Sequence, residues 1–203
     1  MKKVLLFCFT LLLTFNLFSQ EEEKTKLSRF LSKSYYSVNF GGIFYPFSND
    51  NLKPGFETET FSKNYFSGRI IFLGHKLKPD LALQFGVIRP AAWFKYDNVN
   101  NIGYERSVWI NAWYFSLKKK FYLNKKLSFY GELGVANVTR IGFSINDETI
   151  YPNTHFGSLL YGFGFNYKLN ERWRLALNGT FMPKPSKNNQ PSISQTSFGF
   201  EYH

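Results

Sequence analysis

With 203 residues, the chain is long enough to enclose one sizeable core, and its length suggests a single domain. Aromatic residues make up 20% of it although the mean hydropathy is only -0.27, so the apolar side chains must be unevenly distributed. A single cysteine excludes an intramolecular disulfide. The net charge of +11 would suit nucleic acid, but the export signal described next favours contact with anionic lipid, or simple solubility.

Residues 1–20 have the layout of a secretory signal peptide. Lys2 and Lys3 precede an apolar run from Val4 to Phe18, which is short for a membrane span; a retained single-span anchor is the alternative. Cys8 lies in the middle of the run, which argues against a lipid-modified amino terminus. Cleavage removes the only thiol and the two lysines, which lowers the formal charge from +11 to +9.

Residues 21–33 are expected to form a periplasmic leader, and residues 34–203 the folded domain. In the leader, Leu27, Phe30 and Leu31 are spaced as on a short amphipathic helix, with a flexible charged segment as the alternative. Beyond residue 34 no window is apolar enough for a transmembrane helix, and apolar residues alternate with a period of two. This periodicity predicts β-strands.

The alternation is clearest in residues 156–167, FGSLLYGFGFNY. One face is large and apolar (Leu159, Tyr161, Phe163, Phe165, Tyr167) and the other small or polar (Ser158, Gly162, Gly164, Asn166), with Phe156 and Leu160 as exceptions. Most strands predicted in this way reach the roughly 9 to 11 residues that a tilted strand needs to cross a bilayer. The eight strands are expected near residues 34–47, 64–77, 81–97, 107–123, 126–143, 155–169, 172–184 and 194–203.

The connections between these strands alternate in length. The second, fourth and sixth are short turns, at Pro79-Asp80, Asn124-Lys125 and Asn170-Glu171, in the sequences KPD, NKK and NER. The others are longer and rich in Asn, Pro and Ser, at residues 48–63, 98–106, 144–154 and 185–193. Such alternation is typical of an up-and-down antiparallel sheet in which only one end is elaborate.

Alternation alone does not separate a membrane barrel from a soluble one, because both have one apolar face. In a small membrane barrel the second face lines a narrow lumen and should be small or polar. Four strands favour this arrangement, because each has one face of large apolar residues that can be directed to lipid. These faces are the one given above for residues 156–167 and, on the other three strands, Leu127, Phe129, Leu133 and Val135; Trp173, Leu175 and Leu177; and Phe198, Phe200 and Tyr202. The second and fourth strands are less regular, because residues 70–73 are apolar on both faces and Lys119 would face lipid unless it lies at the interface.

Aromatic residues near the predicted strand ends also suit a membrane barrel, because rings with a polar edge are stable at the headgroup level. Rings are abundant throughout the chain, so this placement supports the membrane interpretation without deciding it. The residues concerned are Tyr35, Tyr36, Phe47, Trp93, Trp109, Trp113, Tyr122, Tyr167 and Trp173.

In these features the chain resembles the small eight-stranded outer-membrane barrels of Gram-negative bacteria, the OmpA/OmpX type in the broad sense. The resemblance covers nearly the whole mature chain and is architectural. In that family the last strand carries alternating aromatics that end on Phe, and it serves as a signal for the barrel-assembly machinery. SFGFEYH, residues 197–203, matches at Phe198, Phe200 and Tyr202 but ends on His203, so either the signal tolerates this ending or the sequence stops one residue early.

Charged residues in the lumen must pair, because they are withdrawn from water. A structural ladder of such pairs is therefore expected, and no catalytic residue. The lumenal residues predicted are Glu132, Arg172, Arg174, Glu201, Arg69 and His75. The histidines His75, His155 and His203 lack ligand spacing and no phosphate-binding loop occurs, so no metal and no cofactor is expected.

Residues 178–202 are also similar to the final hairpin of the outer-membrane lipid A deacylases, including a Gln-Pro at Gln190-Pro191. Those enzymes carry a His and a Ser two residues apart, shortly before the Gln-Pro, as base and nucleophile. Met182 and Lys184 occupy these positions here and cannot do that work. His155 and Ser158, at the other end of the preceding hairpin, are a poor substitute.

The sequence therefore predicts an all-β protein, an eight-stranded antiparallel up-and-down transmembrane β-barrel in the bacterial outer membrane. We expect it to be a non-enzymatic monomer with a filled lumen, with its termini and short turns in the periplasm, serving envelope structure or surface binding through its four extracellular loops. Expected partners are outer-membrane lipid, lipopolysaccharide and the barrel-assembly machinery, and not nucleic acid. The alternatives are a lipid A-modifying barrel enzyme and a secreted soluble β-barrel that binds an apolar ligand.

Overall fold

A computed structural model describes residues 26–45, 52–57, 60–62, 65–90, 94–97, 99, 106–183 and 192–203. The chain divides into two units, residues 1–32 and residues 33–203. In the first unit, residues Lys26–Leu31 form the helix α2, which is the helical alternative for the leader. The predicted signal peptide and residues 21–25 lie outside the described residues. No helix in the described part of the chain is long and apolar enough to cross a membrane.

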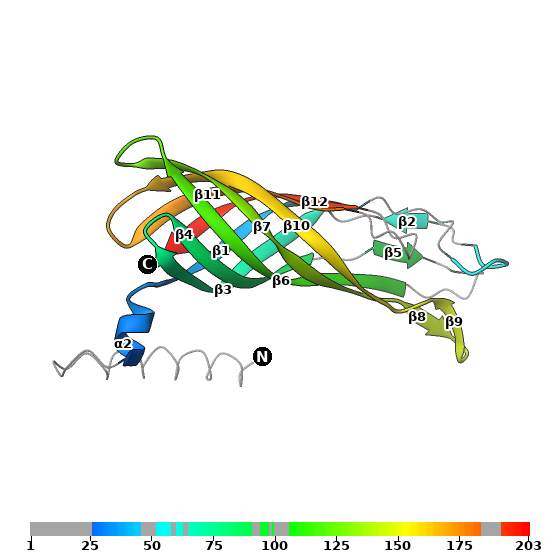
Figure 1. The fold of residues 1–203 in the computed structure, drawn as a ribbon. Coiled ribbons are helices and arrows are strands. Elements are labelled where there is room, and N and C mark those ends of the chain that lie inside the picture. Colours follow the sequence, from blue (N-terminus) through cyan, green and yellow to red (C-terminus); the bar gives the residue numbers. More distant parts are fainter. Residues whose placement is uncertain are drawn as a thin grey trace, which may run out of the picture. The chain divides into compact units, whose positions relative to one another are not determined.

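Eight long antiparallel strands of the second unit pair in a closed ring (Figure 1). They are β1 (Ser34–Phe44), β3 (Phe66–Lys78), β4 (Leu81–Pro90), β6 (Arg106–Tyr122), β7 (Leu127–Ile141), β10 (Thr154–Lys168), β11 (Trp173–Met182) and β12 (Ile193–Tyr202). Each strand pairs with its neighbours around the ring, and β12 pairs with β1 to close it. The predicted fold class, an eight-stranded antiparallel barrel, is confirmed.

Two of the three short turns are held by the same side-chain contact. In the β6–β7 turn, Asn124 Oδ1 accepts hydrogen bonds from the N–H groups of Lys126 and Leu127, both at 2.8 Å. In the β10–β11 turn, Asn170 Oδ1 accepts from the N–H groups of Arg172 at 2.9 Å and Trp173 at 2.8 Å. An asparagine that binds the backbone two and three residues ahead fixes a tight turn.

The third turn, between β3 and β4, is held by a charge pair instead. Asp80 binds the ammonium of Lys119 on the adjacent strand β6, and this contact holds the pKa of Asp80 below its usual value. Lys119 therefore lies at the edge of the apolar wall, as its sequence context predicted.

We expect Asn124→Ala and Asn170→Ala each to lower the free energy of unfolding by about 1 kcal/mol, since each leaves two turn N–H groups without their acceptor. The matched controls, Asn124→Asp and Asn170→Asp, keep the accepting oxygen and should stay near the parent. Urea titration of the purified barrel in detergent, followed by tryptophan fluorescence, measures the difference. Equal losses for the Ala and Asp variants would contradict this role.

Four short strands extend the barrel at the end of the long connections, opposite the carboxyl terminus (Figure 1). They are β2 (Thr60–Ser62), β5 (Phe94–Asp97), β8 (Phe143–Ile145) and β9 (Glu148–Tyr151). β2 pairs with β5, which pairs with β6, and β8 pairs with β9. The two residues between β8 and β9, Asn146 and Asp147, have φ of 48° and 64°, which is typical of a two-residue hairpin turn.

Two sequence predictions were wrong at this end. The segments 48–63 and 144–154, expected to be loops, contain β2 in the first and β9 with part of β8 in the second. The single strand predicted over residues 81–97 is two strands, because β4 ends at Pro90 and β5 begins at Phe94. Proline has no N–H to continue the ladder, which explains the break.

The irregular face of β3 is due to a β-bulge. The register with β4 shifts between Ile71 and Leu73 and the register with β1 shifts between Ile71 and Gly74, so that one extra residue is accommodated there. Ile71 is buried inside the barrel while Phe72 is exposed outside. After the bulge, the alternation of inward and outward side chains begins anew. The apolar residues 70–73 therefore contribute to both the inner and the outer face of the barrel.

The outer face of the barrel is apolar, as predicted. Exposed there are Leu133, Val135, Leu159, Tyr161, Phe163, Phe165, Tyr167, Trp173, Leu177, Phe198, Phe200 and Tyr202, while Leu127, Phe129 and Leu175 are half-buried. Phe156 and Leu160, the exceptions on β10, face inward and belong to the core. A surface of this size covered by large apolar side chains requires an apolar solvent.

The predicted strand-end aromatics are on this surface with one correction. Tyr36, Trp113, Tyr122, Tyr167 and Trp173 are exposed, Trp109 is half-buried, and Phe47 and Trp93 lie outside the described residues. Tyr35 was wrongly assigned to the interface: its side chain is fully buried, and its hydroxyl accepts a hydrogen bond from Gln84 Nε2 at 2.7 Å. Adjacent residues of a strand point to opposite faces, so Tyr35 and Tyr36 could not both face outward.

Candidate functional site

The lumen is filled by side chains, polar toward the short turns and apolar toward the long connections. Its first polar cluster surrounds Arg69 of β3, whose side chain is fully buried. Arg69 Nη2 lies 2.7 Å from both carboxylate oxygens of Glu132, and its Nε and Nη1 donate to Tyr114 at 2.9 Å and Thr180 at 3.0 Å. Ser116 donates to Glu132 at 2.5 Å. All three guanidinium nitrogens are thus bonded, which a buried charge requires.

The second polar cluster is centred on Glu201 of β12. Its carboxylate lies 2.8 Å from Lys118 Nζ, 3.0 Å from Lys120 Nζ and 3.6 Å from Arg174 Nη1. His203 Nε2 lies 2.7 Å from the same carboxylate. Lys118 also lies 4.1 Å from the centroid of the Tyr130 ring, and this cation–π contact compensates part of its lost hydration. A single carboxylate therefore holds three cations inside the barrel.

The lumenal prediction was right for Glu132, Arg69, Arg174 and Glu201 and wrong for two residues. Arg172 is exposed, because it precedes β11 and lies in the turn, where its backbone N–H donates to Asn170 Oδ1 at 2.9 Å and its backbone oxygen accepts from the N–H of His203 at 2.9 Å. His75 pairs in register with Leu83, one position from the lumenal Gln84, so it lies on the outer face, 3.2 Å from Ser34 Oγ. The inward position predicted for His75 assumed uninterrupted alternation along β3, and the β-bulge at Ile71–Leu73 interchanges the inward and outward positions that follow it.

Lys118 and Lys120 were missed by the sequence analysis. They flank Lys119 in the run Lys118-Lys119-Lys120, and the alternation that directs Lys119 outward directs its two neighbours inward. The alternation of Tyr114 and Ser116, both buried, would have placed Lys118 and Lys120 inside if it had been extended.

The other half of the lumen is an apolar core that continues into the extension. It includes Ile110, Val138, Leu160, Met182 and Ile193 from the barrel, and Leu52, Val99, Ile145 and Ile150 from the long connections. Arg140 lies 4.6 Å from the centroid of the Tyr151 ring, and Tyr96 packs on Tyr151 with ring centroids 5.9 Å apart. Burial raises the pKa of both phenols. The described parts of the long connections thus plug the barrel rather than leave its mouth open.

This arrangement offers no base and nucleophile pair at His155 and Ser158. They lie three residues apart on β10, so they face opposite sides of the wall. His155 Nδ1 lies 3.2 Å from Thr139 Oγ1, whereas Ser158 donates to the backbone oxygen of Pro183 at 3.0 Å. Met182 is buried in the apolar core, and Lys184 lies outside the described residues. Among the residues that the structure describes, no three metal-binding side chains gather.

No known protein family matches the chain, and no curated protein does either. Several solved structures are similar in fold. The N-terminal β-barrel domain of Pseudomonas aeruginosa OprF matches with a TM-score of 0.51 and 15% identity, over 84% of this chain and 96% of that one. Neisserial surface protein A matches with a TM-score of 0.54 and 12% identity, over 84% of this chain and 96% of that one. The attachment invasion locus protein Ail of Yersinia pestis, in complex with the heparin analogue sucrose octasulfate, matches with a TM-score of 0.52 and 14% identity, over 84% of this chain and 98% of that one.

At such low identity, the likeness shows the fold alone. The chain has the fold of the small eight-stranded outer-membrane barrels, which confirms the architectural resemblance inferred from the sequence.

Proposed function

We propose that the protein is a non-enzymatic, monomeric β-barrel of the bacterial outer membrane, exported by residues 1–20, with its short turns and carboxyl terminus in the periplasm. The observation that carries this proposal is the combination of an apolar outer wall with a lumen filled by buried ion pairs and an apolar plug. A soluble barrel would expose its charges outward. A general pore would keep a continuous polar channel, whereas this core extends from the wall into the long connections.

Recognition at the cell surface would then fall to the extension formed by the long connections. Its described parts are ordered around Tyr96, Arg140 and Tyr151, so they can present a fixed surface above the membrane. Yersinia pestis Ail, which is similar in fold, is named for attachment and invasion and was solved with a heparin analogue. Surface binding, together with a structural role in the envelope, is therefore the function that we assign. The last strand, with Phe198, Phe200 and Tyr202 facing outward, would engage the assembly machinery.

Cell fractionation and electrophoresis test the location. We expect the full chain in the outer-membrane fraction, with a mobility that shifts when the detergent extract is heated. Reconstituted into planar bilayers, it should give no sustained conductance steps, because the lumen is filled. Recovery in the soluble periplasm, or steady ion conduction, would contradict the proposal. A change in lipid A species on expression, abolished by His155→Ala, would instead support the enzymatic alternative.

A further inference from the structure

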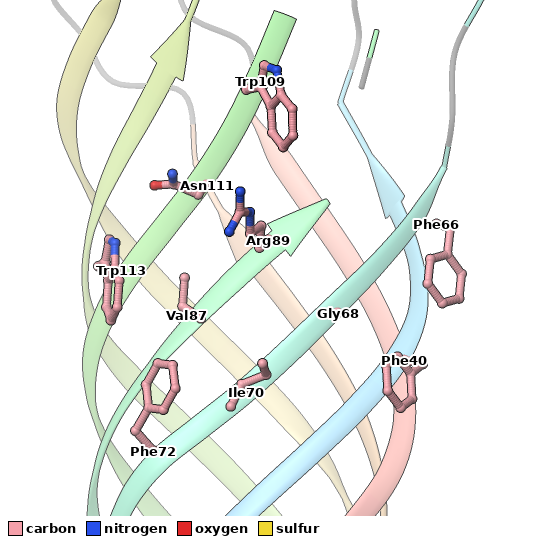
Figure 2. A pocket seen from close by; sticks show the side chains of 10 residues that line it. All are labelled: Phe40, Phe66, Gly68, Ile70, Phe72, Val87, Arg89, Trp109, Asn111 and Trp113. Atoms are coloured by element: carbon pink, nitrogen blue, oxygen red, sulfur yellow. The ribbon is translucent and has the colours of Figure 1, made fainter. Parts of the chain in front are cut away.

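The outer wall carries a hollow of about 530 Å³ between β1, β3, β4 and β6. Figure 2 shows its rim of aromatic side chains, with the backbone of Gly68 crossing its middle. The lining is Phe40, Phe66, Gly68, Ile70, Phe72, Val87, Arg89, Trp109, Asn111 and Trp113. Gly68 pairs with Phe40 on one side and Arg89 on the other, so the missing side chain opens the floor between them. This volume is within the range of small-ligand sites, and its wall is apolar except at Arg89 and Asn111.

The two polar residues lie at one border of the apolar wall. On β4 the outward positions before Arg89 are Leu81, Leu83, Phe85 and Val87. From Leu81 to Arg89 the strand rises roughly 20 Å along the barrel axis, at about 3.3 Å per residue and a tilt of about 40°, against an apolar band of about 25 Å. On β6, Asn111 is separated from Lys119 by outward Trp113, Phe115 and Leu117. Arg89 and Asn111 therefore lie near headgroup level at the end of the long connections.

Arg89 has no counter-charge in the described part of the chain. Its guanidinium carbon lies 5.4 Å from the centroid of the Trp109 ring, and no ion pair or hydrogen bond joins the guanidinium to another described residue. Its side chain is exposed on the outer wall. A guanidinium beside hydrocarbon is most stable with an anion that it can bind through two N–H groups, and the phosphates of lipid headgroups lie at this level.

Asn111 is the second polar residue that lines the same hollow. Its Oδ1 is buried and forms no hydrogen bond within the described residues. In Figure 2, Asn111 and Arg89 project from neighbouring strands between Trp109 and Trp113. Because this oxygen is buried, Asn111 borders the hollow without offering it an acceptor, and Arg89 is the side chain that can bind an anionic ligand there.

We propose that this hollow binds a phosphorylated glycolipid of the outer leaflet, of the lipid A class. An acyl chain lies on Gly68 and Val87 between the aromatic side chains, and one phosphate binds Arg89. The inference rests on the proposed outer-membrane location and goes beyond general contact with lipid, since it assigns one lipid to one place on the wall.

Native mass spectrometry of the full chain in detergent, titrated with diphosphorylated lipid A, tests the site. We expect Arg89→Gln to weaken binding about tenfold, which corresponds to about 1.4 kcal/mol. Gly68→Leu should weaken it as strongly by filling the floor. The nearest atoms to a Cβ at Gly68 are backbone oxygens at 3.8 and 3.9 Å, so a Cβ fits there without displacing the backbone.

The matched controls are Gly157→Leu and Lys126→Gln. A Cβ at Gly157, on the outer face of β10, meets nothing within 4 Å, and Lys126 is an exposed cation in a short turn. Both should bind lipid A within about twofold of the parent. Equal affinity of all variants, equal affinity for lipid A freed of its phosphates, or full competition by inorganic phosphate would overturn the inference. The heat-dependent gel shift of each variant reports folding separately, so loss of the shift in the parent would count against the proposed function instead.

Discussion

Replacing Glu201 with glutamine should lower the free energy of unfolding by about 3–5 kcal/mol, the range measured when one partner of a buried ion pair is removed. The substitution removes the carboxylate that Lys118, Lys120 and Arg174 share in the lumen, although the side chain keeps its size. Urea unfolding of the barrel in lipid vesicles, read from the heat-dependent gel shift, measures the loss.

Glu171→Gln is the control for that substitution. Glu171 lies in the β10–β11 turn and pairs with Lys168 at 2.5 Å, but its side chain is 89% exposed. Exposed pairs contribute little, so the stability of this variant should match that of the parent. If Glu201→Gln and Glu171→Gln behaved alike, the Glu201 cluster would not be a buried ion network.

Arg69 and Glu132 should show the second large effect, and it should be non-additive. Arg69→Met leaves a buried carboxylate, and Glu132→Leu leaves a buried guanidinium, so each alone should lower stability by about 3–5 kcal/mol. The double variant removes both charges and should recover most of that loss, because apolar side chains of similar size pack well in place of such pairs.

A double-mutant cycle on the four proteins gives the coupling energy directly. Tyr114, Ser116 and Thr180 lose a partner in the double variant, so the recovery will be incomplete. Losses that simply add would contradict the bidentate contact seen between Arg69 and Glu132.

The barrel and half of its lumen could be predicted from the sequence because alternation is a local signal. Glu132 and Glu201 stand opposite apolar residues within regular strands, so their direction follows from their neighbours. The face of β3 on which His75 lies could not be predicted, since the β-bulge at Ile71–Leu73 interchanges the inward and outward positions that follow it. The extension was missed because β2, β5, β8 and β9 are only 3 or 4 residues long and depend on pairing partners far along the chain.

The hollow on the outer wall lies beyond sequence analysis for a related reason. Gly68, Arg89 and Asn111 are on three strands, and only the register of β3, β4 and β6 brings them together. In the sequence, Gly68 and Arg89 are merely interruptions of apolar alternation.

Oxygen accessibility of spin labels along β10 tests the central claim, that the barrel wall faces lipid and the lumen is filled. Single cysteines at positions 159, 160, 161, 163, 165 and 166, introduced into a Cys8→Ser background and labelled in lipid vesicles, report the surroundings of each residue. We predict that accessibility to oxygen alternates, high at Leu159, Tyr161, Phe163 and Phe165 and low at the inward positions 160 and 166, which neither oxygen nor a water-soluble relaxation agent reaches. High accessibility of Tyr161, Phe163 and Phe165 to the water-soluble agent would contradict the membrane barrel, and high accessibility of the inward positions 160 and 166 to it would contradict the filled lumen.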